Sequence, residues 1–216
     1  GKAYLILGSS LGSIPEIDLS LADYSFVGEE AGDYAGISVA GAGDVDGDGL
    51  GDLLMGARGN DDGGDWAGKA YLILGASLGS SSTIDLSAAD YSFVGENAID
   101  LAGTSVSGAG DVDGDGLDDI LVGAFANDDG GTNAGKAYLI LGSSLGSSST
   151  IDLSAADYSF VGENATNDAG WSVSSAGDVD GDGLADLIVG AYRNADGGYD
   201  AGKAYLILGA SLGSTS

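Results

Sequence analysis

The sequence of 216 residues predicts an all-β fold built of propeller-type, four-stranded antiparallel blades. Three observations lead to this prediction. The string GKAYLILG begins at Gly1, Gly68, Gly135 and Gly202, which gives a period of 67 residues. Each repeat contains four short strand candidates separated by glycine-rich or polar turns. No segment carries the 3.6-residue hydrophobic periodicity of an amphipathic helix, so we expect little helix.

The chain is expected to form a single repeat domain over residues 1–216. A repeat of this kind buries its apolar surface only by stacking on copies of itself. Residues 1–34 supply the third and fourth strands of a first blade, and residues 35–101 and 102–168 form the first and second repeats. The third repeat, residues 169–216, is expected to end in an incomplete blade that lacks its fourth strand.

The four strands of a blade are expected at equivalent places in every repeat, here given for the second. The first, Ser105–Gly110, consists largely of small residues, as expected at the crowded centre of a propeller. The second is Asp119–Ala124, the third is Lys136–Leu141 and the fourth is Tyr158–Val161. The third strand carries apolar side chains on both faces, which stacked blades would cover. A generic β-sandwich is an alternative, and a parallel β-helix is a weaker one because its coils repeat at shorter intervals.

The composition excludes several classes of function. The chain has 34 acidic and 6 basic residues, a formal net charge of −28, and no histidine or cysteine. It therefore has no disulfide, no zinc-thiolate site and no Ser-His-Asp triad. Its negative surface repels nucleic acid and anionic lipid. Its longest apolar stretches, of about five residues, are much shorter than the roughly 20 that span a bilayer. We expect neither nucleic acid binding nor membrane insertion, and cations are the favoured partners.

The chemistry concentrates in the segment DVDGDGLGD, which begins at Asp44 and recurs at Asp111 and Asp178 with only its eighth residue changed. Carboxylates at its first, third, fifth and ninth positions, a glycine at the sixth and a backbone carbonyl at the seventh can direct hard oxygen ligands at one ion. The candidate ligands are Asp44, Asp46, Asp48, Leu50 and Asp52, then Asp111, Asp113, Asp115, Leu117 and Asp119, then Asp178, Asp180, Asp182, Leu184 and Asp186. The glycines at the sixth position, Gly49, Gly116 and Gly183, are expected to adopt a positive φ.

The expected ion is Ca²⁺, about three in all and one per repeat. Oxygen-only ligands disfavour zinc and copper, and a flexible loop with many carboxylates suits calcium better than magnesium. An EF-hand needs a glutamate at position 12 and flanking helices, whereas position 12 here is Met55, Val122 or Val189. We therefore expect a calcium loop that closes a β-hairpin. The simpler alternative, plain Asp-Gly turns on an acidic surface, explains less well why the four aspartates recur at the same spacing.

The segment AGWSVSSAGDVDGDGLADLIVGA over residues 169–191, followed by GKAYLILG, resembles the FG-GAP repeat of integrin α-subunit propellers and of bacterial extracellular repeat proteins. The resemblance implies an extracellular or cell-surface propeller whose loop aspartates, the twelve named above, bind calcium on one face. The chain differs from the family by having Ala-Gly in place of Phe-Gly, as at Ala169-Gly170. This change does not touch the ligand positions.

The two ends of the sequence are nearly identical, because GKAYLILGSSLGSIP opens it and GKAYLILGASLGSTS closes it. Unpaired strands at both ends would invite strand addition. Three alternatives follow: a piece of a longer propeller, a six-bladed ring of two chains that exchange end strands, or a head-to-tail filament. Self-association as a homo-oligomer or polymer is the preferred expectation.

The preferred function is a non-enzymatic calcium-binding module for adhesion or surface assembly, with a protein or glycan as a further partner. A calcium-stabilised lectin is the alternative, with Trp171, Tyr192 and Tyr199 as a candidate sugar-stacking patch. A glycan-active enzyme with paired carboxylates is a remote one, because the aspartate clusters recur three times whereas an active site is normally unique. Second acidic loops near Asp62, Asp129 and Asp196 are interpreted as solvated turns, with another calcium site as the alternative.

Overall fold

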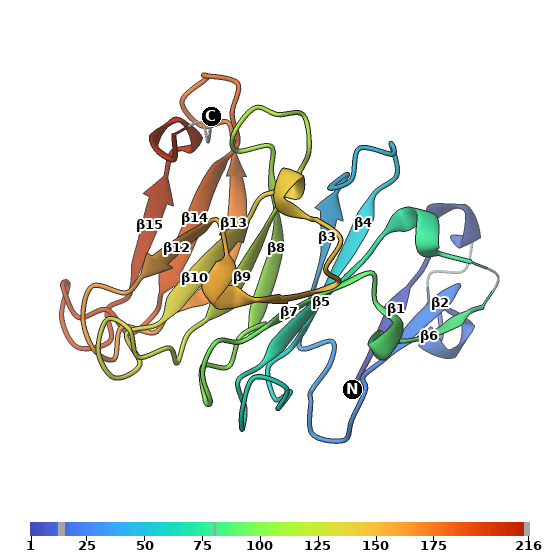
Figure 1. The fold of residues 1–216 in the computed structure, drawn as a ribbon, viewed down its shortest axis with the longest axis horizontal. Coiled ribbons are helices and arrows are strands. Elements are labelled where there is room, and N and C mark those ends of the chain that lie inside the picture. Colours follow the sequence, from blue (N-terminus) through green and yellow to red (C-terminus); the bar gives the residue numbers. More distant parts are fainter. Residues whose placement is uncertain (13–15, 80, 214–216) are drawn as a thin grey trace.

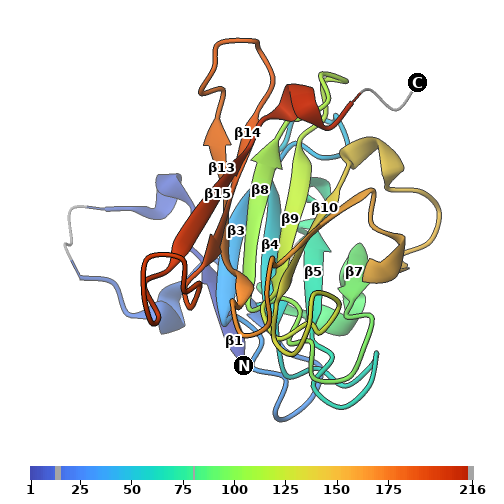
Figure 2. The same ribbon diagram turned by 90° about the vertical axis from the view of Figure 1, so that its left-hand side faces the viewer.

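A computed structural model describes residues 1–12, 16–79 and 81–213. These residues form four β-sheets and short 3₁₀ turns, and none of them is in an α-helix, which confirms the predicted all-β fold class. The sheets stand side by side in a row (Figure 1), and a view turned by 90° shows their strands roughly aligned (Figure 2). In the described part of the chain, no helix is long and apolar enough to cross a membrane.

The second repeat forms a four-stranded antiparallel blade. Its strands are β8 (Ser105–Gly110), β9 (Asp119–Ala124), β10 (Lys136–Ile140) and β12 (Tyr158–Val161), in the spatial order β12-β10-β9-β8. These bounds agree with the four predicted strands, apart from one residue at the end of β10.

The other sheets repeat this pattern, completely or in part. One contains β3 (Ser38–Gly43), β4 (Asp52–Ala57), β5 (Lys69–Ile73) and β7 (Tyr91–Val94); another contains β13 (Ala169–Gly177), β14 (Asp186–Ala191) and β15 (Lys203–Ile207); a third contains β1 (Lys2–Leu5) and β2 (Tyr24–Val27). The 3₁₀ turns are Gly8–Ser10, Leu19–Leu21, Gly75–Ser77, Leu86–Ala88, Gly142–Ser144, Leu153–Ala155 and Gly209–Ser211. The proposed division into residues 1–34, 35–101, 102–168 and 169–216 remains a prediction.

Two short strands, β6 (Thr83–Asp85) and β11 (Thr150–Asp152), were not expected from the sequence. Each lies in the connection between the third and fourth strands of one repeat but pairs in parallel with the fourth strand of the preceding repeat, β6 with β2 and β11 with β7. Hydrogen bonds hold this contact, as from the Ser92 N–H to the Ser149 carbonyl at 2.8 Å. The first and second repeats thus each add a strand to the sheet before them, so that β6 is the third strand of the first sheet and β11 is the fifth strand of the next.

The hydrophobic core lies between the sheets. On β9 and β10, Val122 and Tyr138 pack with Leu54 and Leu72 of the preceding blade, in one cluster. Their neighbours Leu121 and Leu139 pack with Val173 and Leu187 of the following sheet, in another cluster. Both faces of the second blade are therefore covered, as the apolar residues on both sides of its strands require.

The blades approach closely enough to require glycine. A Cβ atom on Gly123 in β9 would overlap the Gly170 carbonyl of the next sheet, and a Cβ on Gly56 would overlap the Gly103 carbonyl in the same way. A backbone hydrogen bond between the two repeats lies beside Gly103, from the Ala102 N–H to the Ala67 carbonyl at 2.9 Å. A larger residue here would push the sheets apart.

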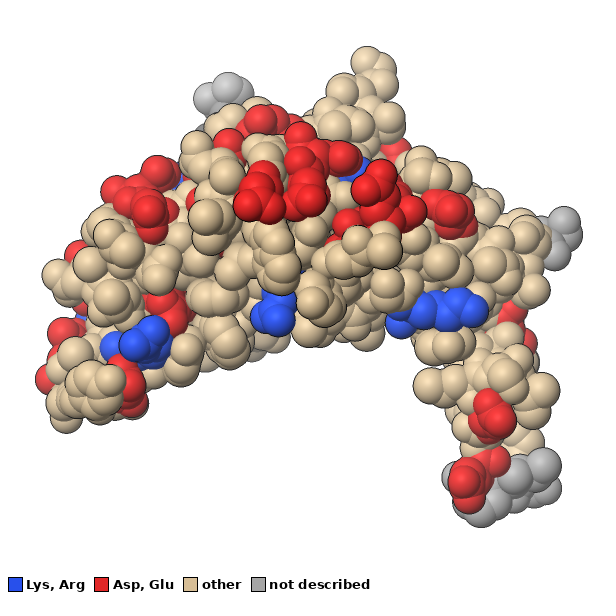
Figure 3. Space-filling view, turned by 90° about the horizontal axis from the view of Figure 1, so that it is seen from below, with Lys and Arg blue, Asp and Glu red and all other residues tan. Residues whose placement is uncertain are grey.

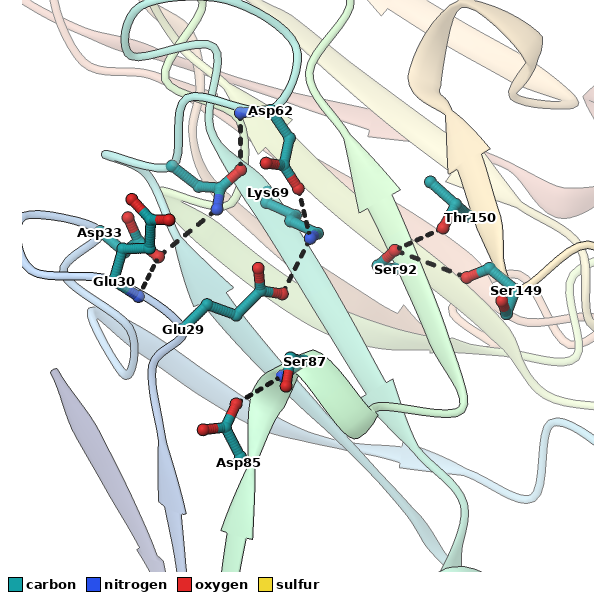
Figure 4. Close-up of polar contacts among 11 residues, drawn as sticks. Glu29, Glu30, Asp33, Asp62, Lys69, Asp85, Ser87, Ser92, Ser149 and Thr150 are labelled. Atoms are coloured by element: carbon teal, nitrogen blue, oxygen red, sulfur yellow. Dashed lines mark hydrogen bonds and ion pairs between the residues drawn. The ribbon is translucent and has the colours of Figure 1, made fainter.

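Ion pairs of two buried lysines also join successive blades. The Lys69 ammonium on β5 lies 2.9 Å from Glu29, which follows β2 of the preceding sheet, and 2.7 Å from Asp62 in its own β4–β5 loop (Figure 4). Lys136 repeats this arrangement with Glu96 and Asp129, both at 2.7 Å, and the Tyr138 hydroxyl also donates to Glu96 at 2.7 Å. Because each lysine side chain is largely buried, these contacts hold the blades at a fixed distance from one another.

Candidate metal centres

The three acidic loops join β3 to β4, β8 to β9 and β13 to β14, and all three lie at the same end of the sheets (Figure 1). Gly49, Gly116 and Gly183 adopt positive φ angles of 86°, 91° and 94°, as predicted. Gly47, Gly114 and Gly181 also have positive φ, which was not expected from the sequence. Two glycines in the left-handed region fold each loop tightly enough to turn its carboxylates inward.

The loops bring predicted ligand residues together. Carboxylate oxygens lie within 4.8 Å of one another in three groups: Asp44, Asp46 and Asp48; Asp111, Asp113 and Asp115; and Asp178, Asp180 and Asp186. The first and third positions thus meet in every copy. The fifth position joins them in the first two loops, and the ninth position joins them in the third.

The aspartate at the ninth position is buried in every repeat and also holds the base of the loop. The Asp52 carboxylate accepts hydrogen bonds from the Val45 N–H at 2.9 Å and from the Gly75 N–H at 2.7 Å. Asp119 and Asp186 accept the equivalent pairs of bonds. Burial raises the pKa of Asp119 to about 7, against the lowering effect of these hydrogen bonds. A cation beside this carboxylate would favour its charged form.

One carboxylate oxygen supports the presence of an ion in the first loop. Asp44 Oδ1 is buried and has no hydrogen-bond partner among the described residues, while Asp44 Oδ2 accepts from the Gly49 N–H at 2.9 Å. A buried, unpaired carboxylate oxygen is costly unless something positive faces it. Together with the neighbouring carboxylates, which offer only hard oxygen donors, this atom makes the loop suitable for a divalent cation such as Ca²⁺.

The residue predicted to contribute a backbone carbonyl also joins one loop to the next. Leu50, Leu117 and Leu184 lie in the turns, and each donates its N–H to the carboxylate two residues earlier, at 2.7 to 2.9 Å. The Leu117 side chain packs over Gly47 of the preceding loop. The position of the leucine side chain is therefore set by contact between blades, and the carbonyl role stays a prediction.

The loops are connected in series by hydrogen bonds that involve a residue not expected from the sequence. The Asp118 N–H donates to the Asp44 carbonyl at 3.0 Å, and the Asp118 carboxylate accepts from the Asp44 N–H at 2.8 Å. The Ala185 N–H makes the equivalent bond to the Asp111 carbonyl at 2.8 Å. The role of Asp118 was not predicted, because the equivalent residues of the other repeats are Gly51 and Ala185 and the aspartate is therefore not part of the repeated pattern.

The second acidic loops lie at the opposite end of the sheets and use their carboxylates in turns and ion pairs. Asp62, Asp129 and Asp196 bind the ammonium groups of Lys69, Lys136 and Lys203. The Asp61 carboxylate accepts from the Trp66 N–H at 2.7 Å. Figure 3 shows this end of the molecule as an arch hollowed on one side, with acidic groups gathered on the outer part. These contacts support the interpretation as turns.

An aromatic cluster lies near the second acidic loop of the last repeat. The Trp171 ring is 4.6 Å from Phe125 and 4.5 Å from Tyr192, measured between ring centroids. Trp171 and Tyr192 are exposed. Tyr199 is also exposed, but no ring contact joins it to this cluster. Two of the three residues of the predicted patch are therefore brought together, with Phe125 as an addition.

The fold and the repeated loops define a propeller-type repeat protein with three candidate metal centres. The family model of the FG-GAP repeat matches residues 35–73, 102–140 and 169–207. The chain belongs to the FG-GAP repeat family, and the predicted resemblance is confirmed.

Several curated proteins similar to the chain are integrin α subunits. Integrin alpha-PS2 of Drosophila melanogaster is 31% identical over 79% of the chain, integrin alpha-5 of Xenopus laevis is 31% identical over 78%, and integrin alpha-V of Gallus gallus is 30% identical over 78%. The chain spans only 12% of the length of the first of these proteins and 16% of the other two. The similarity therefore concerns the repeat region and not the whole relatives.

Proposed function

We propose that the chain is a non-catalytic calcium-binding module of the cell surface or extracellular space that serves adhesion or surface assembly. The observation that carries the proposal is the set of three equivalent carboxylate loops, in one of which Asp44 Oδ1 is buried without a partner. The relatives are named integrins, which supports an adhesive and extracellular role. Calcium would neutralise the loops and hold successive blades together through the contacts of Asp44 with Asp118.

The expected contribution of calcium to stability is large. Extracellular calcium modules bind with dissociation constants of about 10⁻⁴ to 10⁻³ M. At about 10 mM calcium, each site would add roughly 1.4 to 2.7 kcal/mol to the free energy of unfolding, and three sites about 4 to 8 kcal/mol. This sum is comparable to the net stability of a whole domain.

The test is thermal unfolding with calcium and with excess EDTA, combined with calorimetric titration of calcium. We expect chelation to lower the melting temperature and the titration to give about three sites, as counted from the loops. Asp113→Asn should weaken binding at one site. Asp65→Asn is the matched control, because Asp65 is an exposed aspartate outside the three loops. An unchanged melting curve together with no heat of calcium binding would overturn the proposal.

Carbohydrate binding is the second candidate, favoured by the cluster of Phe125, Trp171 and Tyr192. Exposed aromatic rings offer apolar faces on which a sugar ring can stack. The test is a glycan array followed by titration of the glycans that bind. Trp171→Ala should abolish this binding. Trp66→Ala should leave glycan binding intact, because Trp66 contacts Tyr34 and both residues precede the repeats that contain Phe125, Trp171 and Tyr192. Binding to no glycan, or equal loss in both variants, would contradict this candidate.

A further inference from the structure

The first two acidic loops are joined through one residue that lies between two predicted ligands. Asp118 stands between Leu117, the predicted carbonyl donor of the second loop, and Asp119, its ninth-position carboxylate. The Asp118 N–H donates to the Asp44 carbonyl at 3.0 Å, and its carboxylate accepts from the Asp44 N–H at 2.8 Å. Because Asp44 is the first predicted ligand of the first loop, a single residue connects the two ligand sets.

A glycine at the end of β3 makes room for the Asp118 carboxylate. Gly43 has a positive φ of 85°, and a Cβ atom on it would overlap this carboxylate. Below the loops, the inner strands β3 and β8 are held at a fixed spacing by a hydrogen bond from the Val106 N–H to Ser38 Oγ at 3.1 Å. The contact of Asp118 with the first loop is therefore set by the packing of the blades and not by the turns alone.

Two further contacts join the first loop to groups that shape the second. The Leu117 side chain packs over Gly47 in the turn of the first loop. The Val45 carbonyl of the first loop lies against Gly142, whose N–H donates to the Asp119 carboxylate at 2.9 Å. A displacement of either loop would therefore disturb backbone groups that position the ligands of the other.

The second and third loops repeat these contacts without the carboxylate. The Ala185 N–H donates to the Asp111 carbonyl at 2.8 Å, and the Leu184 side chain packs over Gly114. Ala185 has only a methyl group where Asp118 has a side chain that accepts a hydrogen bond. The chain thus contains one pair of loops with the additional bond and a similar pair without it, which serves as an internal comparison.

We propose that the first and second loops bind divalent cations cooperatively, with Asp118 as the positioning residue that links the conformation of the second loop to Asp44. The second and third loops, which lack this carboxylate contact, are coupled more weakly. The inference rests on the calcium-binding function proposed above and goes beyond it, because three independent sites would satisfy that function equally well.

The physical reason for the coupling is the cost of ordering the loops. Carboxylates that converge without a cation repel one another, so a loop without its ion is harder to hold in one conformation. Once the second loop is ordered, Leu117 and Asp118 hold the backbone of the first, and an ion then binds the first loop at a lower entropic cost. Repulsion between two ions opposes this effect, but four aspartates per loop outnumber the charges of one divalent ion. By linkage, the first loop strengthens binding at the second by the same factor.

The test is calorimetric titration of calcium into variants in which single loops are disabled at their third and fifth positions, away from the contacts between loops. The disabling changes are Asp46→Asn/Asp48→Asn, Asp113→Asn/Asp115→Asn and Asp180→Asn/Asp182→Asn. Disabling two loops at a time gives the dissociation constant of each remaining loop alone. With only the third loop disabled, we expect the product of the two dissociation constants to be about tenfold smaller than the product of the values measured for each loop alone. With only the first loop disabled, this factor should be about two.

Substitutions of Asp118 separate positioning from a general effect on folding. Asp118→Ala should reduce the tenfold factor to about two, whereas Asp118→Asn should largely restore it, because the amide oxygen can still accept from the Asp44 N–H. Asp65→Ala is the matched control, since it removes an exposed aspartate outside the three loops. Far-UV circular dichroism at saturating calcium checks that each variant is folded. A purely structural role for Asp118 would weaken all sites together and leave the factor unchanged.

Amide hydrogen exchange gives a second readout that does not require an ion in the first loop. With the first loop disabled, calcium should slow exchange of the Asp44 N–H about tenfold, and Asp118→Ala should remove this protection. A factor of one for the first and second loops, or the same factor before and after Asp118→Ala, would overturn the inference. Independent binding at three sites would overturn this inference alone, whereas no heat of calcium binding in any variant would overturn the proposed function as well.

Discussion

The strands β10 and β15 have the same sequence, KAYLI, but different surroundings. All five residues of β10 are buried, whereas β15 alternates between half-buried and exposed residues. Strand β10 lies between β9 and β12 and between two neighbouring sheets, while β15 is the edge of the last sheet. The repeat sequence therefore specifies the strand and its register, and the position in the stack decides whether its side chains are buried.

The same difference applies to the ion pairs at the start of these strands. Lys136 is largely buried between Glu96 and Asp129, whereas Lys203 and its partners Glu163 and Asp196 are more exposed. Burial opposes the charge of Lys136, but its hydrogen bonds to Asp129 and Glu96 outweigh this effect and raise the pKa of the lysine. An identical chemical group thus has a larger structural role in the inner blade than in the outer one.

The largest effect is expected when Lys136 is replaced by methionine. Lys136→Met leaves the largely buried Glu96 carboxylate without its cation, so we expect a loss of about 3 kcal/mol in the free energy of unfolding. Lys203→Met is the matched variant and should cost clearly less, because solvent screens the groups that remain. Urea denaturation of both variants measures the difference. Equal losses would mean that the last blade is as well covered as the inner one.

A smaller effect is expected from removing one leucine side chain. Leu139 on β10 is fully buried between the second and third blades, whereas Leu206 at the same position of β15 is exposed. Leu139→Ala should cost about 2 to 3 kcal/mol, and Leu206→Ala less than about 1 kcal/mol. A loss in Leu206→Ala of the same size as in Leu139→Ala would contradict the comparison.

Most of the blade was predictable because its information is local. The strand bounds of β8, β9 and β12 follow from short apolar runs between glycine turns, and the repeated aspartates located the three loops. Strands β6 and β11 were not predictable in the same way. Each has only three residues and is stabilised by hydrogen bonds to a different repeat, so the strand preference of its threonine and isoleucine is too short a signal to indicate a strand.

The candidate sites show a similar division between local and long-range information. The glycine at the sixth loop position was predictable from turn chemistry, and its φ is positive as expected. The role of Asp118 depends on the spacing between blades, which no single repeat encodes. The assignment of the twelve aspartates and three leucines as ligands remains a prediction for the calcium titration to test.

The smallest expected effect concerns a position where two repeats differ naturally. Asp100 is buried and accepts a hydrogen bond from Asn127 Nδ2 at 2.8 Å, while the equivalent residue of the next repeat is Asn167. Burial, aided by the charge of nearby Glu96, raises the pKa of Asp100.

A carboxyl with a raised pKa stabilises the fold below its unfolded pKa of about 3.9, and this stabilisation is lost as the pH rises through the folded value. Asp100→Asn keeps the acceptor without the charge, so it should be more stable than the parent by about 1 kcal/mol at pH 7 and about equal to it near pH 3.5. Urea denaturation with calcium present measures the free energy of unfolding of both proteins between pH 3.5 and 7. If the two curves run parallel over this range, the charged Asp100 carboxylate does not destabilise the fold and the prediction is wrong.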